Sequence, residues 1–166
     1  MMGSNIEMDL GELVAAADPA SILAVGPRSA EVFRHYVAQH PGCNLQMIER
    51  DDSLQTLDVV GRYDLVFVGG VLEHMNKQKA AELIARLRDM HTKRLYLLVP
   101  MGKMWLAHAS HWEQNDLIAF GMELVNVYAE NGWPFHLYKF DLHSYKGVPE
   151  WFNSKNWAHP ELWDKC

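Results

Sequence analysis

Four short segments contain most of the candidate binding and catalytic residues, and each directly follows an apolar run of the chain. The segments are residues 26–30, 49–52, 69–75 and 100–102. An open parallel sheet binds its ligand beyond the carboxyl ends of its strands. If the apolar runs are strands of one sheet, these segments meet at one edge and form a single site.

The first two segments favour a ligand that carries a ribose or an anion. Glu49 ends the second apolar run, and an acid at that position accepts hydrogen bonds from two ribose hydroxyls. The alternative is a solvated charge at a strand end, because Asp51 and Asp52 follow closely. Arg28 and Ser29 precede a predicted helix, and Ser29 is a suitable N-cap. A nucleotide or another anion could bind at that helix start.

The histidines are the candidates for moving protons near neutral pH. His74 follows the third apolar run, whereas His108 and His111 follow the fourth. The alternative for Glu73 and His74 is a structural pair in a loop that caps the next helix or hydrogen-bonds the backbone. His108 and His111 have a spacing that suits two metal ligands, but no third ligand or cysteine pair lies nearby in sequence. We therefore predict no metal site.

The elements that must position these residues alternate between strands and helices. The predicted strands are residues 22–25, 45–48, 64–68, 95–99, 123–129 and 135–142, and the predicted helices are residues 8–17, 29–39, 77–90 and 113–120. Residues 53–60 fit a short helix or a helix with a stub of strand. The alternation predicts an α/β fold, a Rossmann-like three-layer sandwich with a mostly parallel sheet. The turn at residues 131–134 predicts a C-terminal antiparallel hairpin.

The chain is predicted to form one domain with a tail. Residues 1–147 make the α/β domain, and residues 148–166 form an aromatic-rich tail that packs on the same domain. A tail with this many tryptophans could instead serve a partner or a second copy of the chain, as in a homodimer. All six tryptophans lie at or after Trp105. Those around His108 are expected to pack in the core.

Composition excludes several classes of protein. The 166 residues carry 15 Lys and Arg against 21 Asp and Glu, a net charge of −6. A protein that binds nucleic acid through bulk charge needs clustered cations, so we expect no nucleic-acid partner. No segment has the apolar length of a membrane span. Cys43 and Cys166 are far apart, which favours free thiols and a cytoplasmic location.

The whole arrangement resembles the class I S-adenosylmethionine-dependent methyltransferases, particularly their small-molecule branch. The residues that carry the resemblance are 22–26, Glu49, 63–66 and 71–75. The resemblance implies that S-adenosylmethionine is the cofactor and that an unidentified small molecule is the methyl acceptor. It assigns cofactor binding to Gly26, Arg28, Ser29, Glu49, Gly69 and Glu73. His74 and His111 are then the catalytic candidates, because a base near the acceptor takes its proton.

The chain also departs from this family's pattern. The family's first loop has three alternating glycines after an acid, whereas this sequence keeps Gly26 and has Ala24, Arg28 and Ala30 at the other positions. A third strand near Asp58 is at best short. Two functions therefore stay open. One is a methyltransferase, and the alternative is a methyltransferase-like protein that has lost the cofactor and acts as a binding or assembly module.

Overall fold

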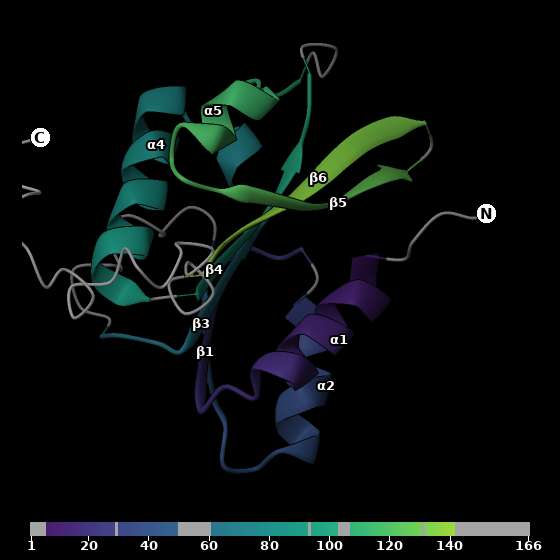
Figure 1. Cartoon of the computed structure of the whole chain (residues 1–166), viewed down its shortest axis with the longest axis vertical. Helices are drawn as coiled ribbons and strands as arrows, with labels where there is room; N and C mark the ends of the chain where they lie inside the picture. Colours follow the sequence, from purple (N-terminus) through teal and green to yellow (C-terminus); the bar gives the residue numbers. More distant parts are fainter. Residues whose placement is uncertain are drawn as a thin grey trace, which may run out of the picture.

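The strands form one mixed sheet. The structure is a computed structural model that describes residues 6–28, 30–49, 61–92, 94–102, 107–130 and 132–141. Within these residues, six strands lie in the order β2-β1-β3-β4-β6-β5 (Figure 1). They are β1 (Ser21–Val25), β2 (Asn44–Ile48), β3 (Leu65–Gly69), β4 (Arg94–Pro100), β5 (Glu123–Glu130) and β6 (Trp133–Asp141). The first four are parallel, and β6 and β5 add an antiparallel hairpin. The predicted fold class is confirmed.

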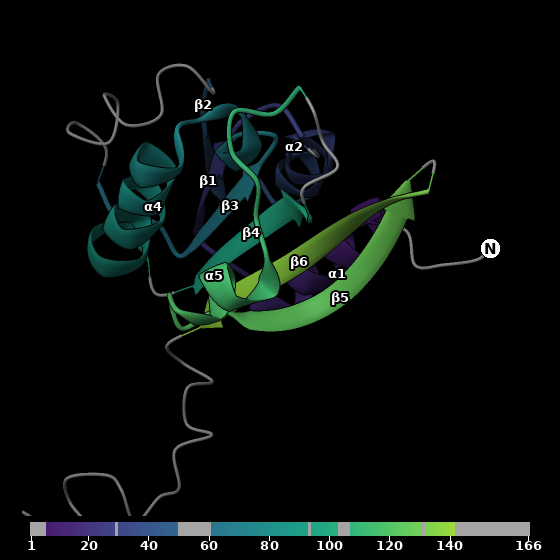
Figure 2. The same ribbon diagram turned by 90° about the horizontal axis from the view of Figure 1, so that it is seen from above.

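Helices cover both faces of this sheet. They are α1 (Ile6–Ala17), α2 (Ala30–Gln39), α4 (Lys77–Arg86) and α5 (Gln114–Ile118), with short helical turns at η2 (Leu72–His74) and η3 (Leu87–His91). The helices α1 and α2 lie side by side on one face, and α4 and α5 lie on the other (Figures 1 and 2). The result is the three-layer sandwich that the alternation of elements predicts.

The central strands are buried on both faces, as expected for a parallel sheet between two helical layers. Every residue of β3 is buried. On the α4 face the core contains Leu83, Ile84 and Trp112. On the α1 face, Leu10 and Phe33 pack beneath the sheet. Trp112 and Met101 are both buried, so the prediction of core packing is confirmed for these two residues, whereas Met104 and Trp105 lie outside the described residues.

Several predicted boundaries differ from the observed ones. The helix predicted at 77–90 ends at Arg86 and continues as the wider turn η3. The helix predicted at 113–120 shortens to α5, because Gly121 follows with a φ of +83° that ends it. Pro134 belongs to β6, where its carbonyl accepts the N–H of Met101. Residues 53–60, with Asp58, and the tail at 148–166 lie outside the described residues.

The remaining predictions of the sequence concern membrane-spanning segments and the two cysteines. In the part of the chain that the structure describes, no helix has the length and hydropathy needed to cross a membrane. Cys43 is buried and forms no disulfide. Burial raises the pKa of its thiol, with smaller contributions from Asp64 and Asp18. Cys166 lies outside the described residues.

Candidate functional site

A cavity of about 430 Å³ opens at the carboxyl ends of β1 and β2. It joins Gly26 and Glu49, two of the predicted cofactor-binding residues, in one place. The loop after β1, the end of β2 and the helices α1 and α2 supply its walls: Glu7, Gly26, Pro27, Ala30, Glu31, Arg34, Met47, Ile48 and Glu49. Its position matches the edge at which open parallel sheets bind ligands.

Gly26 is required by the way the loop after β1 packs. Its φ of +90° lies in the left-handed region, which side chains rarely adopt. A Cβ atom there would also collide with the carbonyl oxygen of Gly69 and the side chain of Val71. The Gly26 N–H donates to the carbonyl of Ile48 at 2.9 Å. The loop is thus held between the ends of β2 and β3, where it forms one wall of the cavity.

The charges around the cavity are mostly negative. Glu7, Glu31 and Glu49 line it, and its single cation, Arg34, pairs with Glu31. Glu49 is exposed and makes no hydrogen bond or ion pair to another described residue. Carboxylates accept hydrogen bonds from hydroxyls and attract cations. This lining therefore fits a hydroxyl-bearing or cationic ligand, and it disfavours a phosphate group.

Arg28 belongs to the loop after β1, and its side chain lies on the side of that loop away from the cavity, next to Gly69 at the end of β3. The Arg28 N–H donates to the Gly69 carbonyl at 3.3 Å. The Arg28 guanidinium forms an ion pair with Glu130 at the end of β5 and lies 5.1 Å from the ring centre of Phe135 in β6. Arg28 does not line the cavity that contains Glu49. Ser29 lies outside the described residues.

Glu73 lies in η2, apart from the cavity. Hydrogen bonds to η2 hold the fastened loop, residues 107–112, which follows β4. The Glu73 carbonyl accepts the N–H groups of Ala109 and Ser110 at 2.8 and 3.2 Å. The Ser110 hydroxyl donates to the Leu72 carbonyl at 2.8 Å and accepts from the indole N–H of Trp112 at 2.9 Å. These bonds hold residues 107–112 in a fixed position above the end of β3.

The fastened loop brings histidines together. The rings of His74 and His108 meet edge to face with their centres 5.3 Å apart. Burial lowers the pKa of His108, and the neighbouring His74 and His111 lower it further. The Glu73 carboxylate lies 3.8 Å from the Nε2 atom of His74. A group of imidazoles of this kind can accept a proton at neutral pH.

The structural alternative for Glu73 and His74 is contradicted only in its first form, in which the pair caps the next helix. The side chain of Asn76 caps α4, because its oxygen accepts the N–H groups of Gln78 and Lys79. The carbonyl of His111 accepts from the ammonium of Lys77 at 2.8 Å. Within the described ranges, no group of three or more His, Cys, Asp or Glu side chains has a geometry that could hold a metal ion.

The predicted site residues therefore form three groups along one edge. Gly26 and Glu49 line the cavity, Arg28 and Gly69 lie beside it, and Glu73, His74 and His111 lie over the ends of β3 and β4. Sequence reasoning missed the Arg28 partners Glu130 and Phe135. No local spacing could have found them, because about a hundred residues separate them from Arg28 and only the fold of the hairpin brings them close.

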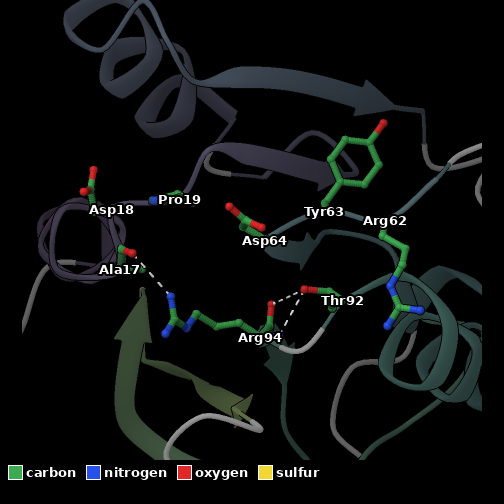
Figure 3. Close-up of a pocket in the computed structure, with 8 residues that line it drawn as sticks. All are labelled: Ala17, Asp18, Pro19, Arg62, Tyr63, Asp64, Thr92 and Arg94. Carbon is green, nitrogen blue, oxygen red and sulfur yellow. Dashed lines mark hydrogen bonds between the residues drawn. The ribbon is translucent and has the colours of Figure 1, made fainter.

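A second cavity, also of about 430 Å³, lies at the opposite, amino end of the strands (Figure 3). Arg94 extends across it to the carbonyl of Ala17 at 3.4 Å and pairs with Asp141 at 3.1 Å. Asp64 accepts the N–H of Ala20 at 2.8 Å. Asp64 and Arg94 thus bond to the protein itself. Figure 3 shows that Arg62 points away from Asp64 and Arg94.

Comparison with protein families decides where the chain belongs. A model of a family described as "Family of unknown function (DUF6231)" matches residues 4–166. The chain belongs to the DUF6231 family. None of the curated proteins matches it.

Solved structures share the fold of this DUF6231 chain. They include magnesium protoporphyrin IX methyltransferase from Synechocystis PCC 6803 with bound SAH, at 12% identity and a TM-score of 0.53, covering 80% of each chain. TehB from Haemophilus influenzae has 12% identity and a TM-score of 0.54, covering 81% of this chain and 62% of its own. The methyltransferase domain of a bacterial CtHen1 structure has 10% identity and a TM-score of 0.55, covering 82% and 97%. At these identities the likeness concerns the fold.

Proposed function

We propose that this chain binds S-adenosylmethionine in the cavity at the carboxyl ends of β1 and β2 and transfers its methyl group to a small molecule. The observation that carries the proposal is the meeting of Gly26 and Glu49 in that cavity. The fold shared with SAH-bound methyltransferases supports it. S-adenosylmethionine supplies a methyl group already activated on a positively charged sulfur.

The residues around the cavity fit this cofactor. The Glu49 carboxylate, exposed at the end of β2, accepts hydrogen bonds from ribose hydroxyls. Glu7 and Glu31 make the surroundings favourable for a cation and unfavourable for phosphate. The left-handed conformation of Gly26 keeps the loop close to β3 and leaves the cavity open beside it. The lining therefore matches an adenosyl sulfonium better than a nucleotide.

The histidines over β3 and β4 supply the remaining chemistry. Methyl transfer to a hydroxyl or an amine releases a proton, which needs an acceptor unless water takes it. His74 and His111 are the proposed catalytic residues, and both lie close enough to His108 to lower its pKa. The lowered pKa of His108 keeps its imidazole neutral at neutral pH. Positioning of the acceptor against these rings is the main contribution that the protein makes.

One observation favours a second function, that of a methyltransferase-like module without cofactor. Arg28 has a large side chain at a position where related enzymes have glycine, and that side chain is tied to the hairpin through Glu130. In this alternative the edge of the sheet serves as a binding surface for another protein. The two functions differ in one measurable property, which is affinity for the cofactor.

Isothermal titration of S-adenosylmethionine and S-adenosylhomocysteine into the full chain tests the proposal. We expect dissociation constants below about 100 μM. Glu49→Ala should weaken binding by roughly tenfold or more, because it removes a charged hydrogen-bond acceptor. Glu12→Ala is the matched control, since Glu12 is an exposed carboxylate on α1 that does not line the cavity. The absence of both heat and thermal stabilisation at millimolar ligand would contradict the proposal and support the module.

A further inference from the structure

The loop after β1 has two different sides. Gly26, Pro27 and Ala30 face the cavity that contains Glu49. The side chain of Arg28 leaves the loop on the other side, where its Cβ lies against Gly69 and Gly70 at the end of β3. In the sheet, β1 lies between β2 and β3. A ligand with its ribose at the end of β2 and a tail crossing β1 therefore reaches the position of Arg28.

The partners of Arg28 hold its guanidinium in place. Glu130 pairs with it, and the ring of Phe135 lies beneath it at 5.1 Å. The side chains of Arg28 and Glu130 are 26% and 41% exposed. An ion pair with this much exposure contributes little net stability, so it exchanges easily for another pair of equal charge. The aromatic contact does not depend on Glu130 and keeps the guanidinium oriented when that carboxylate leaves.

We infer that Arg28 binds the carboxylate of the amino-acid half of the ligand and that Glu130 occupies this position until the ligand arrives. The inference rests on the proposed function. A guanidinium binds carboxylates through two parallel hydrogen bonds, and the carboxylate of an amino acid is chemically equivalent to that of Glu130. Binding then exchanges one carboxylate for another. In this way a loop that has lost its second glycine still holds an amino-acid tail.

The exchange also links binding to the position of the hairpin. Met101 donates its N–H to the Pro134 carbonyl, which ties the end of β4 to the start of β6. The Arg28–Glu130 pair is a second tie, between the loop after β1 and the end of β5. A ligand carboxylate that takes over Arg28 releases this second tie only. Glu130 thus competes with the ligand, and its removal improves the affinity for ligands that carry the carboxylate.

The test compares two ligands on the full chain by isothermal titration. S-adenosylhomocysteine carries the amino-acid tail, whereas 5′-methylthioadenosine has the same adenosine and sulfur without it. Arg28→Met should weaken S-adenosylhomocysteine by roughly tenfold or more and leave methylthioadenosine unchanged. Glu130→Gln should strengthen S-adenosylhomocysteine by about three- to tenfold, again without effect on methylthioadenosine. Glu123→Gln, another exposed acid on β5, is the matched control.

Each outcome separates the inference from the proposed function. If both ligands bind and neither variant changes their ratio of affinities, Arg28 does not hold the carboxylate. If Arg28→Met strengthens S-adenosylhomocysteine, the side chain obstructs the tail, and the inference is wrong while the proposed function stands. If neither ligand binds the wild-type chain, both are wrong. Arg28→Lys keeps the charge without the two-pronged geometry, so it should restore only part of the affinity that Arg28→Met loses.

Discussion

The two cavities at opposite ends of the sheet have nearly the same volume, about 430 Å³ each, but Asp64 and Arg94 at one end differ from Glu49 at the other in their bonds to the protein. At the amino end, Asp64 bonds to the backbone of Ala20, and Arg94 bonds to Asp141. At the carboxyl end, Glu49 makes no hydrogen bond or ion pair to another described residue. Asp64 and Arg94 join α1 and the strands at the first cavity, whereas Glu49 is an exposed carboxylate at the second.

Cavity volume therefore does not distinguish a candidate binding site from a gap in the packing. The bonds that the charged side chains make to the protein do distinguish them. A charged group that bonds to the protein contributes to folding and has less capacity for a ligand. An exposed group without such bonds contributes little to stability and keeps its hydrogen-bonding capacity. Stability and binding should therefore respond in opposite ways to substitutions at the two ends.

The greatest loss of stability should come from a substitution at Gly26, in the loop after β1. Gly26→Ala places a Cβ against the Gly69 carbonyl and the Val71 side chain and forces a strained φ. We expect a loss of about 3 kcal/mol or more in the free energy of unfolding, because strain and overpacking add. Urea denaturation followed by circular dichroism measures it.

Gly42→Ala is the control for this substitution. Nothing lies within 4 Å of a Cβ at Gly42, and its φ is not in the left-handed region. Its effect should stay below about 1 kcal/mol. Equal effects at Gly26 and Gly42 would show that the loop after β1 does not pack against β3 as described.

A smaller loss of stability should distinguish Asp64, at the amino end of the sheet, from Glu49, at the carboxyl end. Asp64→Ala removes the acceptor of the Ala20 N–H at the amino end, so we expect a loss of about 1 kcal/mol in the free energy of unfolding. Glu49→Ala should change stability by less than about 0.5 kcal/mol. Thermal and urea unfolding of the two variants measure the difference. A Glu49→Ala variant as unstable as Asp64→Ala would assign a structural role to Glu49 and remove the contrast between the cavities.

The sequence predicted the sheet well because burial determines it. Apolar runs such as Ile22-Leu23-Ala24-Val25 are strands buried on both faces, and their alternation with helices leaves few topologies. Because strand ends follow from the runs, the positions of Gly26 and Glu49 at one edge also followed. Their meeting in one cavity is a consequence of β1 and β2 being neighbours.

The rest of the site depends on contacts between distant residues. The pairing of Arg28 with Glu130 joins the loop after β1 to the end of β5, residues 102 positions apart in the chain, and no local pattern encodes that. The closeness of His74 and His108 needs Ser110 to bond to η2. The roles given to Ser29, Glu73, His74 and His111 came from a family resemblance, and they remain predictions.

The smallest expected effect is a pH dependence at the carboxyl edge. Burial and two neighbouring histidines lower the pKa of His108 in the folded chain. In the unfolded chain its pKa returns to about 6.5. Between the two values the unfolded chain binds more protons, so stability falls as the pH drops below about 6.5.

His108→Asn should therefore reduce the loss of stability in mild acid. Urea midpoints of the wild-type chain and the variant at about pH 7.5 and pH 5 measure it, and the midpoint of the variant should shift less. The effect is small because a single, partly exposed imidazole causes it. His35→Asn, at an exposed position on α2, is the matched control and should leave the shift as large as in the wild type. A His108→Asn variant that loses as much stability in acid as the wild type would mean that the fastened loop does not keep the imidazole of His108 neutral in the folded chain.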